Sequence, residues 1–207
     1  MQSTQLSYLA LGDSYTIGEM VASSERWPNQ LVKMLETSNV HFHTPIPIAH
    51  SGFTTGELLQ SLQQLEIQGK FDLVSLLIGV NNQYRNQSLS IYKKEFPALL
   101  QYALDKAKDK QHVFVVSIPD WGVTPFGEKD PRGTVQIGKE IEEYNLIAKE
   151  ICAAEDVQFI DITPISKNTA TAYWAVDLLH PSGLQYQQWA EKIFDCLQSN
   201  WIRSEEL

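Results

Sequence analysis

The sequence predicts a single-domain α/β fold, a three-layer α/β/α sandwich in which a five-stranded parallel sheet lies between two layers of helices. Five short apolar and β-branched runs alternate with longer segments of helical period. This alternation is typical of parallel strands joined by right-handed crossovers. The run 73–78 is almost continuously apolar, as strands covered on both faces are. Because no repeat, low-complexity tract or linker divides the chain, one domain is expected over residues 1–207.

The expected strands are the five runs that are short, apolar and rich in β-branched side chains. Side chains of this kind are typical of strands in a buried sheet. These strands are expected at residues 6–11, 40–49, 71–78, 112–118 and 157–162.

The expected helices are the segments in which apolar residues recur at helical spacing and form one stripe. In the first of them, Pro28 suits a first-turn position, where its missing N–H is of no consequence. In the fourth and fifth, the stripe runs through most of the segment, as in helices that pack on a sheet. The helices are expected at residues 27–36, 55–67, 89–108, 135–154 and 182–200.

Two segments, 79–88 and 119–133, fit neither pattern and are expected to be irregular. Both follow expected strands. In open α/β sheets, ligand sites form beyond the carboxyl ends of the strands, so these segments are candidate walls of a cleft.

Charge and hydropathy exclude several classes of protein. The formal net charge of −9 argues against nucleic-acid binding, which depends on cationic surface. The chain has no run that approaches the roughly 18 consecutive apolar residues of a membrane span, and residues 1–10 do not resemble a secretory signal. We expect a cytoplasmic protein without stable membrane insertion. A monomer is the default, with the oligomeric state left open.

Disulfides and metal sites are not expected. Cys152 and Cys196 both lie in helical segments and are expected to be buried free thiols. His41 and His43 share one face of an expected strand, but no cysteine or acidic cluster accompanies them. A structural or surface role is therefore expected for this histidine pair.

Two short blocks at the ends of the first two strands offer chemical groups. In Gly12-Asp13-Ser14, a serine at a tight strand-to-helix turn exposes its hydroxyl and can direct its own N–H at a developing oxyanion. The alternative is a polar turn in which Asp13 or Ser14 caps a helix. Gly52 can present its N–H to a cleft without a side chain in the way, although a simple strand–turn–helix junction is the better explanation of this block taken alone.

Two further blocks follow the third strand and precede the last helix. In Gly79-Val80-Asn81-Asn82, an asparagine amide can donate to an oxyanion, but such a pair after a strand also forms turns. In Asp177-Leu178-Leu179-His180, the three-residue separation lets the carboxylate orient the imidazole, whose other nitrogen can take a proton from a serine. The alternative is a surface histidine at the start of a helix.

The four blocks, taken in this order, resemble those of the SGNH (GDSL-type) hydrolases, and the resemblance spans nearly the whole chain. It implies the flavodoxin-like fold of that family. It also implies Ser14 as the nucleophile, His180 as the general base and Asp177 as the residue that orients the histidine. The implied oxyanion hole consists of the Ser14 N–H, the Gly52 N–H and the side-chain amide of Asn81.

The resemblance has one departure, because Asn82 stands where the family pattern Gly-x-Asn-Asp has an aspartate. That position is not a triad member, so a change in hydrogen bonding near Asn81 is expected rather than a loss of catalysis. The candidate substrate contacts are aromatic residues near the blocks or in the segment 119–133, where the alternative is a loop that packs its own aromatics. These candidates are Tyr15, Tyr84, Trp121 and Phe126.

The activity implied by the resemblance is hydrolysis of a small-molecule carboxylic ester through an acyl-enzyme, without cofactor or metal. The leading hypothesis is an esterase or lysophospholipase-like enzyme for short to medium acyl chains. Carbohydrate O-deacetylation and thioester hydrolysis are alternatives with the same chemistry. A non-catalytic α/β binding module is an alternative of a different class, and such a module is expected to lack at least one triad residue. His50, near Gly52, is interpreted as a turn residue rather than the base.

Overall fold

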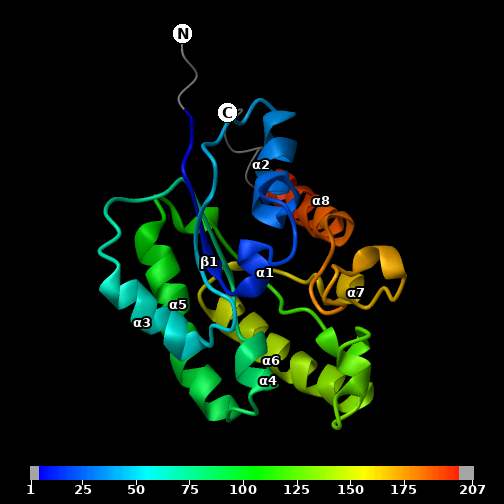
Figure 1. Cartoon of the computed structure of the whole chain (residues 1–207). Coiled ribbons are helices and arrows are strands. Elements are labelled where there is room, and N and C mark those ends of the chain that lie inside the picture. Colours follow the sequence, from blue (N-terminus) through cyan, green and yellow to red (C-terminus); the bar gives the residue numbers. More distant parts are fainter. Residues whose placement is uncertain (1–4, 201–207) are drawn as a thin grey trace.

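The computed structural model describes residues 5–200 of the chain, and its centre is a five-stranded sheet (Figure 1). All neighbouring strands are parallel, and their order is β2-β1-β3-β4-β5. The predicted fold class is therefore confirmed. The strands are β1 (Tyr8–Gly12), β2 (Ile46–Ala49), β3 (Leu73–Leu77), β4 (Val113–Val116) and β5 (Gln158–Ile160).

The five expected helices are present and cover the two faces of the sheet (Figure 1). Two of them pack on each other in one layer, and the other three form the opposite layer. The first layer holds α2 (Trp27–Glu36) and α8 (Gly183–Asn200). The second holds α3 (Thr55–Gln64), α5 (Leu89–Lys106) and α6 (Thr134–Ala154).

The strand order places a topological switch point at the centre of the sheet. After β1 the chain forms β2 on one side of β1. After β2 it crosses to the other side of β1, where it forms β3. The connections that leave β1 and β3 therefore diverge to opposite faces, and they leave a crevice beyond the carboxyl ends of these two strands. Both strands are completely buried.

The second strand is shorter than predicted. The sequence predicts a strand over residues 40–49, but regular pairing begins only at Ile46, and Phe42 forms an isolated bridge with Leu6. Pro45 supplies no N–H to a ladder, which interrupts the strand directly before β2. The edge position of β2 in the sheet accommodates Pro47, because one side of an edge strand needs no partner.

Short helices occur where the sequence predicted none. The segment 79–88, expected to be irregular, contains the helix α4 (Val80–Tyr84), so that prediction was wrong. A helix of about one turn is too short for a repeated apolar stripe to reveal it. Two others of this kind are α1 (Ser14–Ile17) and α7 (Thr163–Ser166). Segment 119–133 holds only two 3-10 turns, Trp121–Val123 and Gly127–Lys129, as its irregular sequence indicates.

Both cysteines are free thiols, as expected. Cys152 is buried, and burial raises the pKa of its thiol to about 12. Cys196 is only partly buried. Among residues 5–200, no helix is both long and apolar enough to cross a membrane.

Candidate active site

Ser14 lies at the carboxyl end of β1, in a turn that requires glycine beside it. A Cβ on Gly12 would lie 2.1 Å from Thr16 Oγ1 and 2.4 Å from the carbonyl oxygen of Leu77. The chain then enters α1 at once, with Asp13 as its N-cap; the Asp13 carboxylate accepts from the Tyr15 N–H at 3.0 Å. Ser14 is therefore the first residue of a helix, where a backbone N–H has no intrahelical acceptor.

The three residues of the expected triad are joined by hydrogen bonds. The Ser14 hydroxyl lies 3.0 Å from His180 Nε2, and His180 Nδ1 donates to Asp177 Oδ2 at 2.5 Å. The other carboxylate oxygen, Asp177 Oδ1, accepts from the backbone N–H groups of Leu179 and His180, each at 3.0 Å. Burial raises the pKa of Asp177, but these hydrogen bonds outweigh it, and the pKa lies below its ordinary value.

A backbone hydrogen bond joins the two ends of the loop that carries the histidine. Ala175 N–H donates to the His180 carbonyl at 2.8 Å, and Leu178, between the two triad residues, adopts a left-handed conformation with φ of 60°. The Tyr15 ring packs against the imidazole, with ring centroids 5.3 Å apart. Tyr15, an expected substrate contact, thus also fixes the plane of the histidine ring.

The two other expected oxyanion donors lie beside Ser14. Gly52 has a φ of 82°, in the left-handed region that favours glycine, and its carbonyl accepts from Arg85 at 2.6 Å. Asn81 Nδ2 donates to the carbonyl of Phe53 at 3.0 Å. An amide nitrogen carries two hydrogens, so the second remains available to the cleft that Asn81 lines.

The structure explains why an asparagine occupies position 82. Asn82 is fully buried, and its Oδ1 accepts from the Thr55 N–H at 3.0 Å. Its Nδ2 donates to Thr55 Oγ1 at 2.7 Å and to Gln87 Oε1 at 2.9 Å. A carboxylate could not make the two donations. Asn82 therefore ties the start of α3 to the segment that follows α4.

The expected site residues other than Asp177 and Phe126 line a cleft of about 160 Å³. Tyr84 and Trp121 form part of its wall, and Trp121 is held by a hydrogen bond from its Nε1 to Gln83 Oε1 at 2.7 Å. Phe126 is not among the lining residues; its ring contacts Trp121 at a centroid distance of 6.2 Å. The cleft is lined by Ser14, Tyr15, Glu19, Gly52, Val80, Asn81, Tyr84, Trp121, Leu179 and His180.

Glu19 is a residue of the cleft that sequence reasoning missed. Its carboxylate accepts a hydrogen bond from the Ser51 hydroxyl, and Oε2 lies 3.9 Å from His180 Nε2. The signal in the sequence is its position five residues after Ser14, directly after Gly18, the C-cap of α1. That signal has meaning only once α1 is known to be a helix.

The remaining histidines considered from the sequence lie outside the cleft. His50 is exposed, and its Nδ1 donates to the carbonyl of Ser51 at 2.9 Å. His41 and His43 flank the isolated bridge at Phe42. Within the described part of the chain, no group of three or more His, Cys, Asp or Glu residues could hold a metal ion.

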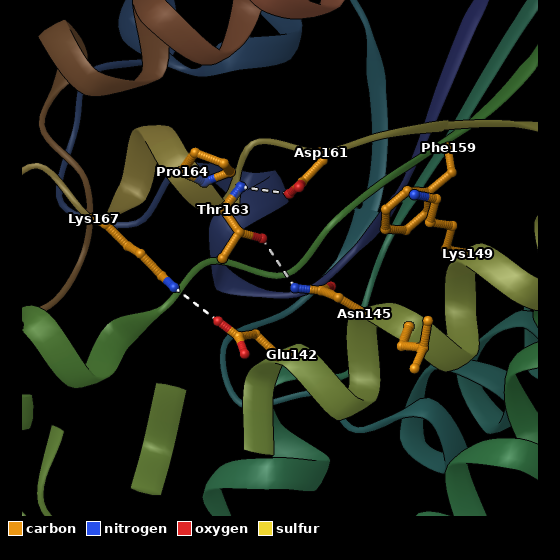
Figure 2. Close-up of a pocket in the computed structure, with 9 residues that line it drawn as sticks. Glu142, Asn145, Lys149, Phe159, Asp161, Thr163, Pro164 and Lys167 are labelled. Carbon is orange, nitrogen blue, oxygen red and sulfur yellow. Dashed lines mark hydrogen bonds and ion pairs between the residues drawn. The ribbon is translucent and has the colours of Figure 1, made fainter. Parts of the chain in front are cut away.

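A larger cavity, of about 250 Å³, shares no lining residue with the cleft (Figure 2). Asn145 of α6 donates to Thr163 Oγ1 and to the carbonyl of Ile118, each at 3.0 Å. Elsewhere in the lining of this cavity, Lys167 Nζ forms an ion pair with Glu142 Oε1 at 3.1 Å. These contacts brace the end of β4, from which the loop that carries Trp121 departs, so we assign this region a structural role.

Comparison with known proteins gives a consistent result. The sequence matches the GDSL-like Lipase/Acylhydrolase family over residues 10–188. It is 27% identical to the spore germination lipase LipC of Bacillus licheniformis, over 91% of this chain and 94% of that protein. It is 24% identical to an acetylxylan esterase of Geobacillus stearothermophilus, over 74% of this chain and 72% of that protein.

Solved structures show the same fold. The crystal structure of TesA superposes with a TM-score of 0.73 and covers 93% of this chain and 98% of that one. At 19% sequence identity, this similarity shows the fold alone.

Proposed function

Because the chain belongs to the GDSL-like lipase/acylhydrolase family, we propose that it hydrolyses carboxylic esters through an acyl-enzyme formed on Ser14. The observation that carries this proposal is the hydrogen-bonded series from Asp177 through His180 to Ser14, with distances of 2.5 and 3.0 Å. A serine, a base within hydrogen-bond reach and a carboxylate that orients the base are the parts that nucleophilic acyl transfer requires.

The first half of the reaction acylates the serine. His180 Nε2 takes the hydroxyl proton as Ser14 Oγ attacks the ester carbonyl, and a tetrahedral intermediate forms. Asp177 holds the imidazole in the tautomer that accepts at Nε2 and stabilises the imidazolium. The bond from carbon to the alcohol oxygen then breaks, and the alcohol leaves with the proton from Nε2.

In the proposed reaction, three hydrogen-bond donors that line the cleft stabilise the negative charge of the intermediate. The Ser14 N–H lies at the start of α1, Gly52 supplies a second backbone N–H, and Asn81 supplies its amide. Loss of one such donor costs about 3 kcal/mol of transition-state stabilisation in other hydrolases. Preorganised donors are effective because they need not reorient as the charge develops.

The second half of the reaction releases the acid. Water attacks the acyl-enzyme while His180 removes its proton, a second oxyanion forms, and Ser14 leaves with the proton returned by the histidine. Every proton that moves has a carrier among these side chains, so the proposed cycle uses no cofactor.

Short to medium acyl chains fit this cleft best. Its volume of about 160 Å³ is modest, and apolar side chains of Val80, Trp121 and Leu179 line it. Acetylated carbohydrate is the second candidate substrate, and the acetylxylan esterase among the relatives favours it. Both candidates use the same triad and differ in the alcohol that leaves.

The proposal is tested with p-nitrophenyl acetate, butyrate and octanoate, and with a fluorophosphonate probe. We expect the wild-type protein to hydrolyse the shorter esters, Ser14→Ala to be inactive, and mass spectrometry to place the probe on Ser14. Acetylated xylo-oligosaccharides and acyl thioesters in the same panel rank the alternatives by kcat/KM. A wild-type protein no faster than Ser14→Ala, with Ser14 unlabelled, would instead indicate a non-catalytic binding module.

A further inference from the structure

Glu19 is held in a fixed place beside the triad. Its N–H donates to the Ser14 carbonyl at 3.0 Å, and its side chain is 28% exposed. The Ser51 hydroxyl donates to Oε2, which lies 3.9 Å from His180 Nε2. The carboxylate thus stands between the imidazole and the residue before Gly52, and it faces the cleft.

The position of Glu19 identifies the part of the substrate that it meets. In the proposed reaction, His180 Nε2 returns its proton to the oxygen of the departing alcohol, so that oxygen must lie next to Nε2. A carboxylate 3.9 Å from Nε2 therefore flanks the alcohol portion of the ester rather than the far end of the acyl chain.

Among the described residues, no lysine or arginine forms an ion pair with Glu19, whose one ionisable partner is the His180 imidazole. Among the residues of the described chain that line the cleft, Glu19 is the only carboxylate, and none is a lysine or arginine. Two arginines near the cleft have carboxylate partners of their own. Arg85 pairs with Glu57 at 3.0 Å, and Arg132 pairs with Asp130 at 2.9 Å.

We propose that Glu19 is a specificity-determining residue that makes the alcohol side of the cleft an acidic subsite. This subsite favours esters whose alcohol portion carries a positive charge and disfavours those whose alcohol portion is anionic. The inference rests on the proposed function, because it assigns the alcohol side from the proton transfer at His180.

Three acetate esters test the proposal. Acetylcholine is cationic, 3,3-dimethylbutyl acetate is its neutral counterpart of the same shape, and 3-acetoxypropane-1-sulfonate is anionic. All three form the same acetyl-enzyme. Any effect of Glu19 on the imidazolium or the oxyanion is shared by them and cancels in a ratio of kcat/KM values. The ratio therefore measures the interaction with the alcohol portion.

The test compares Glu19→Gln with wild type. In wild type we expect kcat/KM to fall in the order cationic, neutral, anionic. In Glu19→Gln, we expect the cationic-to-neutral ratio to fall about fivefold and the anionic-to-neutral ratio to rise about fivefold, which is the effect of one partly hydrated charge a few ångströms away. Glu19→Asp keeps the charge and should keep most of the preference.

Two controls separate a local charge from other causes. Glu36→Gln removes the same charge from an exposed position on α2 and should leave both ratios at wild-type values. In wild type itself, 1 M NaCl should reduce the preference, because it screens charges beyond about 3 Å. This second control needs no variant, and a preference that salt leaves unchanged overturns the acidic subsite even if Glu19→Gln fails to fold. If Glu19→Gln fails to fold and salt does reduce the preference, Glu19→Ala replaces it, and unchanged ratios in that variant overturn the acidic subsite.

The outcomes are distinguishable. If Ser14 is labelled by the probe and the neutral ester is hydrolysed, but the ratios of Glu19→Gln equal those of wild type, the acidic subsite is wrong and the proposed function stands. The acidic subsite is equally wrong if Glu19→Gln does not fold and salt leaves the wild-type ratios unchanged. If Ser14 stays unlabelled and no ester is hydrolysed, both proposals fail together.

Discussion

Asp177 binds His180 twice, once through each carboxylate oxygen. Oδ2 accepts from the ring Nδ1 at 2.5 Å, and Oδ1 accepts from the backbone N–H of the same residue at 3.0 Å. The carboxylate therefore fixes both the loop and the ring, and the two roles can be separated by substitution.

The first prediction concerns Asp177→Asn. The amide oxygen can still accept from the backbone, but an NH₂ group that faces Nδ1 forces the imidazole into the wrong tautomer. We expect kcat/KM to fall by about 10³- to 10⁴-fold, by analogy with this change in other serine hydrolases. Thermal unfolding should change little. A variant that retains more than a tenth of wild-type activity would show that Asp177 does not set the tautomer.

The second prediction concerns the combined loss of Ser14 and His180. Triad members act as a unit, so Ser14→Ala, His180→Ala and the double variant should have similar residual rates. Ester hydrolysis by the purified variants measures this. His50→Ala is the matched control, because His50 is exposed and does not line the cleft. Near-wild-type activity in His180→Ala together with inactivity in His50→Ala would identify His50 as the base.

The third prediction concerns Asn82→Asp, which introduces the aspartate of the family pattern. The new carboxylate would face Gln87 Oε1, which now accepts a hydrogen bond from Asn82 Nδ2 at 2.9 Å. We expect the free energy of unfolding to fall by about 2 kcal/mol at neutral pH, because the buried side chain at position 82 can no longer donate to Thr55 and Gln87. Urea unfolding measures the change.

The control for this substitution is Gln64→Glu, which adds the same charge at an exposed position on α3. It should change stability by less than about 0.5 kcal/mol. If Asn82→Asp is as stable as wild type, the buried hydrogen bonds of Asn82 contribute no net stability.

The fourth prediction concerns the pH dependence of stability through Asp13. Burial raises the pKa of this carboxyl to about 8, against the hydrogen bond from the Tyr15 N–H, which lowers it. Between its ordinary pKa of 3.8 and about 8, the unfolded chain loses the proton while the folded protein keeps it. The contribution of Asp13 to stability is therefore full below the ordinary value and is lost as pH rises through the raised one.

Asp13→Asn tests this prediction, because its amide stays neutral and keeps an acceptor for the Tyr15 N–H. The stability of the variant relative to wild type should rise from pH 4 to pH 8 by on the order of 2 kcal/mol. Urea unfolding at several pH values measures the difference. A difference that is constant across this range would mean that Asp13 is ionised in the folded protein.

Much of the fold could be predicted because its signals are periodic. The stripes of α6 and α8 and the apolar run of β3 each extend over enough residues for their period to be recognised. The one-turn helices α1 and α4 are too short to show a period, and the start of β2 depends on how Pro45 and Pro47 meet the edge of the sheet.

The parts of the candidate site whose positions follow from the strand topology could be predicted from the sequence. The carboxyl ends of parallel strands meet at one edge, so the groups after β1, β2 and β3 had to converge. Glu19 was missed because its approach to His180 depends on where α1 ends, at Gly18. Phe126 was predicted as a contact because its aromatic ring lies in segment 119–133, which follows a strand. The turn at Gly127–Lys129 places it against Trp121 instead of in the cleft.

The Ser14–His180 hydrogen bond joins residues 166 positions apart in the chain. The nucleophile leaves the ribosome early, and its base follows only after all five strands have been synthesised. In the folded protein, α8 packs on α2, and we expect this packing to bring the preceding loop, with its histidine, to the serine during refolding. Hydrolytic activity therefore requires a contact between two residues that are far apart in the chain. During refolding, we expect activity to recover later than the helical circular dichroism signal.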